Sequence, residues 1–560
     1  MYRLKRYSTS RIAMLAATLC AVVVTAGCTS ISGHPVAARN TSPFYTAVVD
    51  LMMQSAAHYT GSDANGTTWD MRTTSGGEVL GKATSGGDST DILVVGGKSY
   101  VKLPKSKAAA NLPRGLSLSD VDGKWLTGSD DLDAEIPTGA LSPRELAKRL
   151  LQALDNTTNF PRVGDAPVQV GSDQAFVVPT PMGTLAVSAT APYRLLSLTP
   201  SPDADSATST SPTFDPGGGL GGGSQNDQLS GPIAFVLMTP TDRDQAFNDI
   251  INQTQTLNNS LDVGINFNFD QSGDINCSDT SCTVTSNVTT STSSTRSAKL
   301  SGNVSAVMRA SVTIDDKPSA GCVTTQALPI SGSSVMSCID GSVAPIIAAI
   351  KAGKDAEAQA KANAEGHDVT LNYKIHLAAQ ITVQATAMIQ AEIDRIVMVV
   401  RTEGDNSRNR ANCSQTCSYS QIPYGSDKLS QVANRARTTG GVAPSNNIMV
   451  AVVPGWNDPT TGDQVVGSGD TQPDNATGKS EDDLVTKLAA KGFKPDQITG
   501  LYSERQPCFS ICKSQLAQSL HTGTQVGYSV PWIPNDADST SAVDDLIKRL
   551  AAEDSGAQHK

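Results

Sequence analysis

Apolar and polar residues alternate in several stretches of the first 200 residues, and this alternation predicts strands. The segment "TDILVVGGKSYVKLP" (90–104) predicts two strands joined at Gly96-Gly97, and "GTLAVSATAPYRLLSLTP" (183–200) predicts another pair of extended segments. Between them, "SPRELAKRLLQAL" (142–154) has apolar residues at helical spacing, with Ser142 at the N-cap and Pro143 at the first helical position. This part of the chain is therefore predicted to be an α+β domain.

The pattern continues in the middle of the chain with more strands than helices. "DVGINFNFDQSGDINCSDTSCTVTSNV" (262–288) alternates around a Gly-Asp turn, as strands of a half-buried sheet do. An Ala/Lys/Glu-rich helix is expected at about 344–365, followed by a strand and a second helix. We interpret this part as a β-rich spacer domain.

The last 130 residues alternate between helical and extended patterns, which predicts a three-layer α/β domain. The expected elements are helices at 426–437, 479–492, 508–520 and 541–553, and strands at 446–456, 498–503 and 524–532.

These patterns give a multi-domain fold class. Residues 201–232 are rich in Gly, Ser, Pro and Asp and predict a flexible linker. The expected units are 42–200 (α+β domain), 201–232 (linker), 233–410 (β-rich domain stapled by disulfides) and 425–560 (three-layer α/β domain).

The first residues predict export. Basic residues precede an apolar run at 12–24, which is too short for a stable membrane span, and small residues then lead to Cys28. This arrangement resembles the bacterial lipobox, which implies a signal peptide at 1–27, lipidation of Cys28 and a tether at 28–41. The protein would then be held on the outer side of the cell membrane by its lipid anchor. The alternative is an ordinary signal peptide that contains a cysteine.

Composition agrees with an extracytoplasmic protein, because only 17% of the residues are charged and 4% are aromatic. The net charge of -11 argues against a broad phosphate-binding surface, although a small pocket for one nucleotide remains compatible with it. Of ten cysteines, Cys20 leaves with the signal and Cys28 is the anchor. The other eight form close pairs, which in an oxidising compartment first indicate disulfides: Cys277/Cys282, Cys322/Cys338, Cys413/Cys417 and Cys508/Cys512.

Residues 42–200 resemble the LppX/LprG group of actinobacterial lipoproteins. The resemblance rests on the lipobox and on "VVGGKSYVKLP", "GKWLTG" and "GTLAVSATAPYRLL". It implies a curved sheet with helices inside its concavity, and a lipid as the ligand of this domain.

The C-terminal part resembles the deaminase domains of bacterial polymorphic toxins, which are AID/APOBEC-like. The segments that carry the resemblance are "GKSEDDLVTKLAAKGFKPDQITGLYSERQPCFSIC" and "QVGYSVPW". It implies a zinc cofactor, Glu481 as the proton-transferring acid/base, and Cys508 and Cys512 as metal ligands. It also implies a nucleotide or a single-stranded nucleic acid as substrate, and an immunity protein as partner.

This chain departs from the family pattern at two positions. Lys479 stands where the family has its histidine ligand, and a protonated ammonium cannot donate to zinc. Three residues separate Cys508 from Cys512, where the family usually has two.

Three interpretations of Cys508 and Cys512 therefore stay open: zinc held together with His521, Lys479 or an acid; a fold without metal or catalysis; or a disulfide. In the alternative function, the protein is a non-enzymatic envelope lipoprotein that binds a lipid or a partner.

Three further residues have two readings each. Glu504 matches the family's "SER" segment, or it is a structural carboxylate paired with Arg505 or with a backbone amide. Tyr528 and Trp532 either stack on a base or belong to the core.

Overall fold

The computed structural model describes most of the chain after residue 37. In the described residues the strands form one long sheet, a four-stranded sheet and a separate five-stranded sheet, so the protein is a multi-sheet α+β structure. Among the described helices, none has both the length and the apolar character needed to span a bilayer. The described residues are 38–63, 66–110, 118–128, 142–200, 231–269, 274–292, 303–386, 388, 390–411, 417–470, 480–507, 520, 524–533 and 537–558.

The N-terminal sheet is built largely from antiparallel strands that pair with their neighbours in sequence. The two strands predicted in 90–104 are present and join at Gly96-Gly97. Both glycines have positive φ angles, 58° and 74°, which a two-residue hairpin turn of this kind requires. The strands are β1 (Ala56–Ser62), β2 (Thr68–Thr74), β3 (Val79–Ser85), β4 (Asp88–Val95), β5 (Lys98–Lys102), β6 (Leu126–Thr127), β7 (Val168–Val170), β8 (Asp173–Thr180), β9 (Gly183–Ser188) and β10 (Leu195–Pro200).

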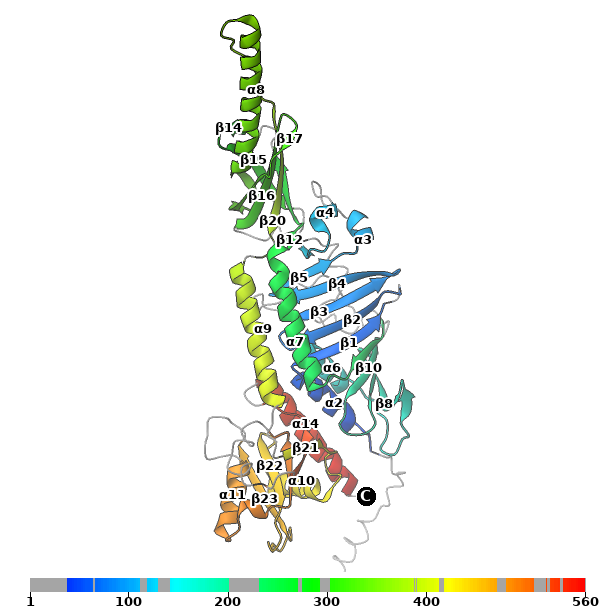
Figure 1. Ribbon diagram of the computed structural model, residues 1–560. Helices are drawn as coiled ribbons and strands as arrows, with labels where there is room; N and C mark the ends of the chain where they lie inside the picture. Colours follow the sequence, from blue (N-terminus) through cyan, green and yellow to red (C-terminus); the bar gives the residue numbers. More distant parts are fainter. Residues whose placement is uncertain are drawn as a thin grey trace, which may run out of the picture.

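Helices cover both faces of this sheet. Successive side chains of a strand point to opposite faces, and so Ile92 packs into the cluster beneath one pair of helices while Leu93 packs beneath another pair. The first pair is α2 (Ser42–Met53) and α6 (Pro143–Asp155), and the second is α7 (Pro240–Gln255) and α9 (Gln390–Ala411), which lie side by side in Figure 1. The short helices of this region are α3 (Lys105–Ala110), α4 (Leu118–Val121) and η1 (Thr256–Asn259).

Packing crosses the boundary expected at 201–232. Strand β11 (Ile233–Val236) follows that segment and pairs with β1 on one side and with β10 on the other. Helices α7 and α9, which belong to the expected unit 233–410, bury their apolar faces against the N-terminal sheet. The two units thus share a sheet and a core. The sequence did not reveal this, because the composition of a linker does not encode which strands pair across it.

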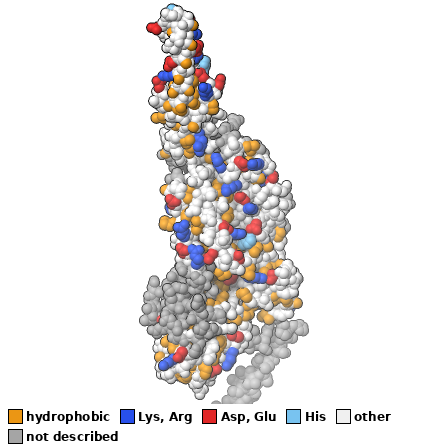
Figure 2. Space-filling model, in the orientation of Figure 1, with side chains coloured by type: hydrophobic (Ala, Val, Ile, Leu, Met, Phe, Trp, Pro, Cys, Tyr) orange, Lys and Arg blue, Asp and Glu red, His pale blue; other side chains and the backbone are white. Residues whose placement is uncertain are grey.

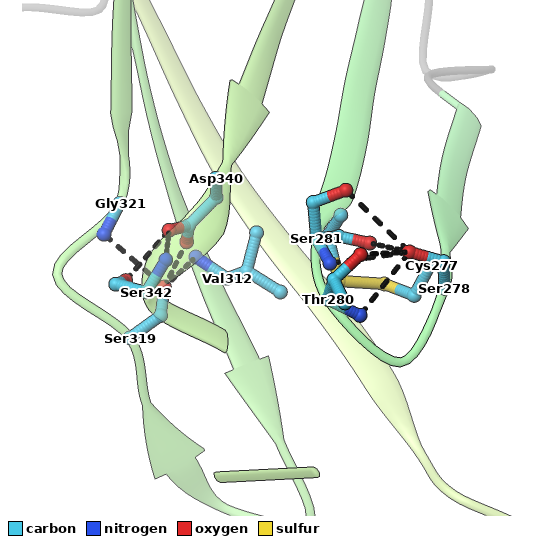
Figure 3. The surroundings of a disulfide bond; sticks show 10 residues. Cys277, Ser278, Thr280, Ser281, Val312, Ser319, Gly321, Asp340 and Ser342 are labelled. Carbon is cyan, nitrogen blue, oxygen red and sulfur yellow. Dashed lines mark hydrogen bonds between the residues drawn. A yellow bond between two sulfur atoms is a disulfide. The ribbon is translucent and has the colours of Figure 1, made fainter. Parts of the chain in front are cut away.

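The middle part forms a second core between two layers of strands. Both predicted disulfides of this part are confirmed, Cys277–Cys282 and Cys322–Cys338. Figure 3 shows the first at a hairpin turn, beside Ser278, whose hydroxyl accepts hydrogen bonds from the backbone of Thr280 and Ser281. The strands are β12 (Leu261–Asp262), β13 (Ile265–Phe269), β14 (Asp274–Cys277), β15 (Cys282–Thr292), β16 (Asn303–Ile314), β17 (Lys317–Pro318), β18 (Cys322–Pro329), β19 (Gly332–Asp340) and β20 (Leu377–Thr386).

The predicted Ala/Lys/Glu-rich helix is confirmed as α8 (Ala344–Glu365), which begins after the short η3 (Gly341–Val343). Helix α8 projects from the end of the molecule opposite the C-terminal sheet (Figure 1). Of its residues only Ile347 is buried, and so this helix contributes little to the core.

The C-terminal part contains a separate mixed sheet with the order β21-β25-β24-β22-β23. Helices α10 and α11 pack against opposite faces of it, since they belong to different apolar clusters. The elements are β21 (Cys417–Gln421), α10 (Lys428–Gly440), β22 (Asn446–Val452), β23 (Gln464–Asp470), α11 (Ser480–Ala490), η4 (Pro495–Gln497), β24 (Gly500–Arg505), β25 (Thr524–Val530) and α14 (Ala537–Gln558). Strands β21 and β23 were not predicted, and the helix expected at 508–520 falls almost wholly outside the described residues.

Helix α14 connects the C-terminal sheet to the N-terminal domain. Its residues Leu546 and Ile547 lie in the same apolar cluster as Phe44 and Val48 of α2. At the edge of this contact the guanidinium of Arg549 lies 2.7 Å from the carboxylate of Asp155. The C-terminal domain is therefore docked on the N-terminal domain in the described structure.

Candidate active site

The candidate acid/base, Glu481, lies in the first turn of α11. The helix is seated closely on β23: a Cβ atom added at Gly467 would lie 2.4 Å from the carbonyl oxygen of Ser480. Asp483 fastens the same turn, because its carboxylate accepts hydrogen bonds from the backbone N–H of Ser468 and from Lys487, both at 2.8 Å. Acidic side chains are favourable at this end of a helix because its backbone N–H groups carry partial positive charge.

A chain of side-chain hydrogen bonds ties this helix end to β24. The amide nitrogen of Asn447 donates to the hydroxyls of Ser480 and Ser503, at 2.9 and 3.0 Å. The hydroxyl of Ser480 in turn donates to the carboxylate of Glu481 at 3.1 Å. The side-chain oxygen of Asn447 accepts the backbone N–H of Arg505 at 3.1 Å. Glu481 is thus held at the edge of the sheet where β24 ends.

The chain leaves β24 at this same edge and reaches Pro507, the residue before Cys508. The backbone N–H of Gln506 donates to the carbonyl of Val530 at 2.7 Å, which fixes the exit direction beside β25. The structure therefore brings the start of α11 and the segment that leads to Cys508 to one edge. Cys508, Cys512, Lys479 and His521 themselves lie outside the described residues.

All of the expected metal ligands therefore lie outside the described residues. Within the described ranges, no group of three or more His, Cys, Asp or Glu side chains is arranged to hold a metal. Thiolates suit zinc, whereas the Lys479 ammonium does not.

On the side of the sheet that α10 covers, Glu504 forms a buried ion pair with Arg437. Its side chain is fully buried, and its oxygens accept hydrogen bonds from Arg437 Nε at 2.9 Å, from the Tyr424 hydroxyl at 2.6 Å and from the Ile448 backbone N–H at 3.1 Å. Burial disfavours the charge on Arg437, but the hydrogen bonds and charge of Glu504 outweigh that effect and raise the pKa of Arg437. Burial, together with the negative charge of Glu504, raises the pKa of Tyr424. Glu504 is therefore a structural carboxylate that holds α10 to β22 and β24.

Arg505 does not pair with Glu504, contrary to one expected reading. Adjacent residues of a strand point to opposite faces, and Arg505 instead binds Asp544 of α14 at 2.6 Å and the carbonyl of Pro444 at 2.7 Å. Its guanidinium also lies 5.8 Å from the ring centre of Trp532. Burial lowers the pKa of Arg505, although the charge of Asp544 opposes this effect.

Tyr528 and Trp532 lie toward the N-terminal domain. Trp532 packs, partly buried, against the cluster that contains α14 and α2. Burial raises the pKa of Tyr528, and the charge of Asp50 on α2 adds to the rise. Trp532 thus belongs to the contact between the domains, and β25, the strand that carries Tyr528, contacts α2.

The remaining expected site residues are described unevenly. Cys28 and Cys413 lie outside the described residues, and Cys417 is part of β21 although its side chain is not described. Sequence reasoning missed Asn447, Ser480, Ser503 and Arg437, which organise the site. Their signal was weak, because buried polar residues of these types are ordinary at the ends of strands and in helices.

One comparison with known proteins gives a match for this part of the chain. The sequence model of a family described as Xanthomonas-like deaminase matches residues 444–549. The matched region begins just before β22, includes Glu481, Cys508 and Cys512, and ends within α14. Among curated proteins no match was found. The C-terminal domain is thus deaminase-like, while the match does not extend to residues 42–200.

Proposed function

We propose that the C-terminal domain is a zinc-dependent hydrolytic deaminase of a cytosine- or adenine-type base, with Glu481 as acid/base and Cys508 and Cys512 as metal ligands. The observation that carries this proposal is the hydrogen-bonded chain Ser480–Asn447–Ser503. It holds the helix end with Glu481 beside the strand that leads to Cys508. The family match over the same region supports the proposal independently.

The chemistry requires one side chain that both accepts and delivers protons. In hydrolytic deamination the oxygen of water bonds to the amidine carbon, the bond from that carbon to the exocyclic nitrogen breaks, and ammonia leaves. Glu481 takes a proton from the water and passes protons to the ring nitrogen and the departing amine. Zinc, when bound, would lower the pKa of the water molecule that it holds and so make this water a better nucleophile.

Lys479 limits this activity in the natural chain. Its ammonium repels a cation and offers no lone pair unless it loses its proton. We expect the natural chain to bind zinc weakly and to turn over slowly, and Lys479→His to strengthen both properties.

The charge of the domain favours a small or single-stranded substrate. Residues 425–560 contain 12 Lys and Arg against 16 Asp and Glu, a net charge of -4. Proteins that grip long nucleic acids are normally basic along the contact, since they neutralise many phosphates.

The full chain, produced with its middle disulfides intact, provides the test. The natural form, Lys479→His and Lys479→His/Glu481→Gln are assayed for zinc content and for ammonia release from cytidine, adenosine and short single-stranded DNA and RNA. We expect Lys479→His to bind one zinc per chain and to deaminate one of these substrates. Glu481→Gln should abolish turnover while the zinc remains.

Asp482→Asn in the Lys479→His background is the matched control, because Asp482 is the exposed acid next to Glu481. Equal loss in both acid variants would contradict the role of Glu481. The proposed enzymatic activity would be contradicted by a mapped Cys508–Cys512 disulfide, or by a Lys479→His variant that neither binds zinc nor turns over substrate. Either result would favour the alternative function, a non-enzymatic lipoprotein.

We also propose that the protein is exported and lipid-anchored at Cys28 on the outer side of the cell membrane. Support comes from the basic start, the short apolar run and the small residues before Cys28. Cys28→Ser should release the protein from the membrane fraction and prevent palmitate incorporation. Continued incorporation in this variant would refute lipidation at Cys28.

A further inference from the structure

A groove lies between helices α7 and α9, on the face of the N-terminal sheet that these two helices cover. It is far along the chain from the candidate active site. The groove has a volume of about 280 Å³. Each helix contributes polar side chains at intervals of three or four residues, so that the two polar rows face the groove: Asn248, Asn252 and Gln255 from α7, and Arg401, Asp405 and Arg408 from α9.

The base of the groove is apolar and closely packed. Phe247 and Ile251 line it from α7. Gly404 of α9 lies opposite, and a Cβ atom at this position would come 3.2 Å from the ring of Phe247. A glycine inside a helix costs about 1 kcal/mol relative to alanine, and the close approach of the two helices explains its presence here.

The two arginines differ in their partners. Arg408 is paired with Asp405 and lies 3.7 Å from Asp244, so its charge is compensated. Arg401 is exposed and makes no ion pair or hydrogen bond with any residue that the structure describes. Both basic and acidic side chains lie over α7 and α9 in Figure 2. The groove therefore contains one uncompensated positive charge next to three side-chain amides.

We propose that this groove binds the carboxylate or phosphate group of a small organic molecule. A guanidinium presents planar N–H donors that match an oxyanion, and such charge-assisted hydrogen bonds are stronger than neutral ones. The amides of Asn248, Asn252 and Gln255 supply further donors without adding charge. Phe247 and Ile251 close the base of the groove but are buried, so the polar side chains around it would carry the recognition. The volume of this groove lies just below the usual range of about 300–1,000 Å³ for ligand pockets, which limits the ligand to a small one.

The test is a calorimetric or NMR titration of the full chain with sodium phosphate, sodium acetate and sodium hexanoate at constant ionic strength. We expect saturable binding of at least one probe, and binding about tenfold weaker in Arg401→Gln, as befits a lost charge-assisted hydrogen bond. A preference for acetate or hexanoate over phosphate would identify a carboxylate group. A preference for phosphate would identify a phosphate group.

Arg395→Gln is the matched control, because Arg395 is an exposed arginine of the same helix that does not line the groove. Asn252→Leu removes an amide and leaves the charge unchanged, and it should weaken binding as well. Unfolding midpoints show that the variants remain folded. The proposal is refuted if Arg401→Gln and Arg395→Gln behave alike, or if the natural chain gives no saturable response to any probe.

Discussion

The carboxylate of Glu504 and the guanidinium of Arg437 form a buried ion pair that joins β24 to α10. The carboxylate of Glu504 also accepts hydrogen bonds from the Tyr424 hydroxyl and from the backbone N–H of Ile448. Glu504, which matches the family's "SER" segment in the sequence, thus holds β24 and β22 to α10.

Removal of one partner of this pair should be costly. Glu504→Gln leaves the buried charge of Arg437 without its counter-ion, and we expect a loss of about 3–5 kcal/mol in the stability of the C-terminal domain. Denaturant unfolding of the full chain measures it. Glu145→Gln breaks the exposed pair with Arg149 and should cost below about 1 kcal/mol. Similar effects of the two changes would contradict the buried pairing.

Asn447→Asp should loosen the start of α11. The variant keeps the acceptor for the Arg505 N–H but loses the donors to Ser480 and Ser503, and a buried group left without a partner costs about 1–3 kcal/mol. Hydrogen exchange of the full chain should be faster at the first turn of α11 and at the end of β24. This readout does not depend on enzymatic activity. Unchanged exchange there would show that Asn447 does not hold the helix.

Swapping the charges of Arg549 and Asp155 should show whether α14 is docked on the N-terminal domain through this ion pair. Arg549→Asp places two carboxylates opposite each other and removes the cation from the ring of Tyr45, 4.4 Å away. Asp155→Arg combined with it restores an ion pair. Because the pair is half-exposed, we expect a coupling of about 0.5–1 kcal/mol in a double-mutant cycle of unfolding free energies. Strictly additive effects would mean that the two domains are not docked through this pair.

Asp50 should make stability depend on pH. Burial raises the pKa of Asp50 to about 6, although the hydrogen bond from Gln54 and the charge of Arg243 oppose the rise. In the unfolded chain the pKa of an aspartate is about 3.9. Between about pH 4 and pH 6 the folded protein therefore holds a proton on Asp50 that the unfolded chain has lost. The unfolding free energy should therefore fall, by on the order of 1 kcal/mol, as the pH rises from about 4 to about 6.

Unfolding midpoints of the natural chain and of Asp50→Asn across this range measure the effect. Asp50→Asn should be the less pH-dependent of the two and the more stable above pH 6. Asp482→Asn, at an exposed carboxylate, should keep the natural pH dependence. The opposite slope in the natural chain would refute the role of Asp50.

The two disulfides should stabilise the middle part unequally. They join residues 16 and 5 positions apart, and the entropy removed from the unfolded chain grows with the loop. We expect Cys322→Ser/Cys338→Ser to cost about 3 kcal/mol and Cys277→Ser/Cys282→Ser about 2 kcal/mol. Denaturant unfolding of each double variant under oxidising conditions checks the order, and a larger cost for the shorter loop would contradict it.

Much of the local structure could be predicted from the sequence, because local chemistry determines it. Gly96-Gly97 predicted a hairpin, Pro143 and the helical spacing after it predicted α6, and the closely spaced cysteines predicted both described disulfides. The alternation of helices and strands after residue 425 predicted a three-layer α/β domain, and the structure has a separate mixed sheet there with α10 and α11 on its two faces.

Only the tertiary structure decided which segments meet. The return of β11 and α7 to the N-terminal sheet, across a linker-like segment, depends on strand pairing between distant residues. Likewise Glu504 pairs with Arg437, 67 positions away, rather than with its neighbour Arg505. The sequence by itself determined most of the elements, although not β21 and β23, and the candidate chemistry, since these follow from short-range patterns. The shared core, the docking of α14 and the polar supports around Glu481 arise from long-range packing, which no short pattern in the chain records.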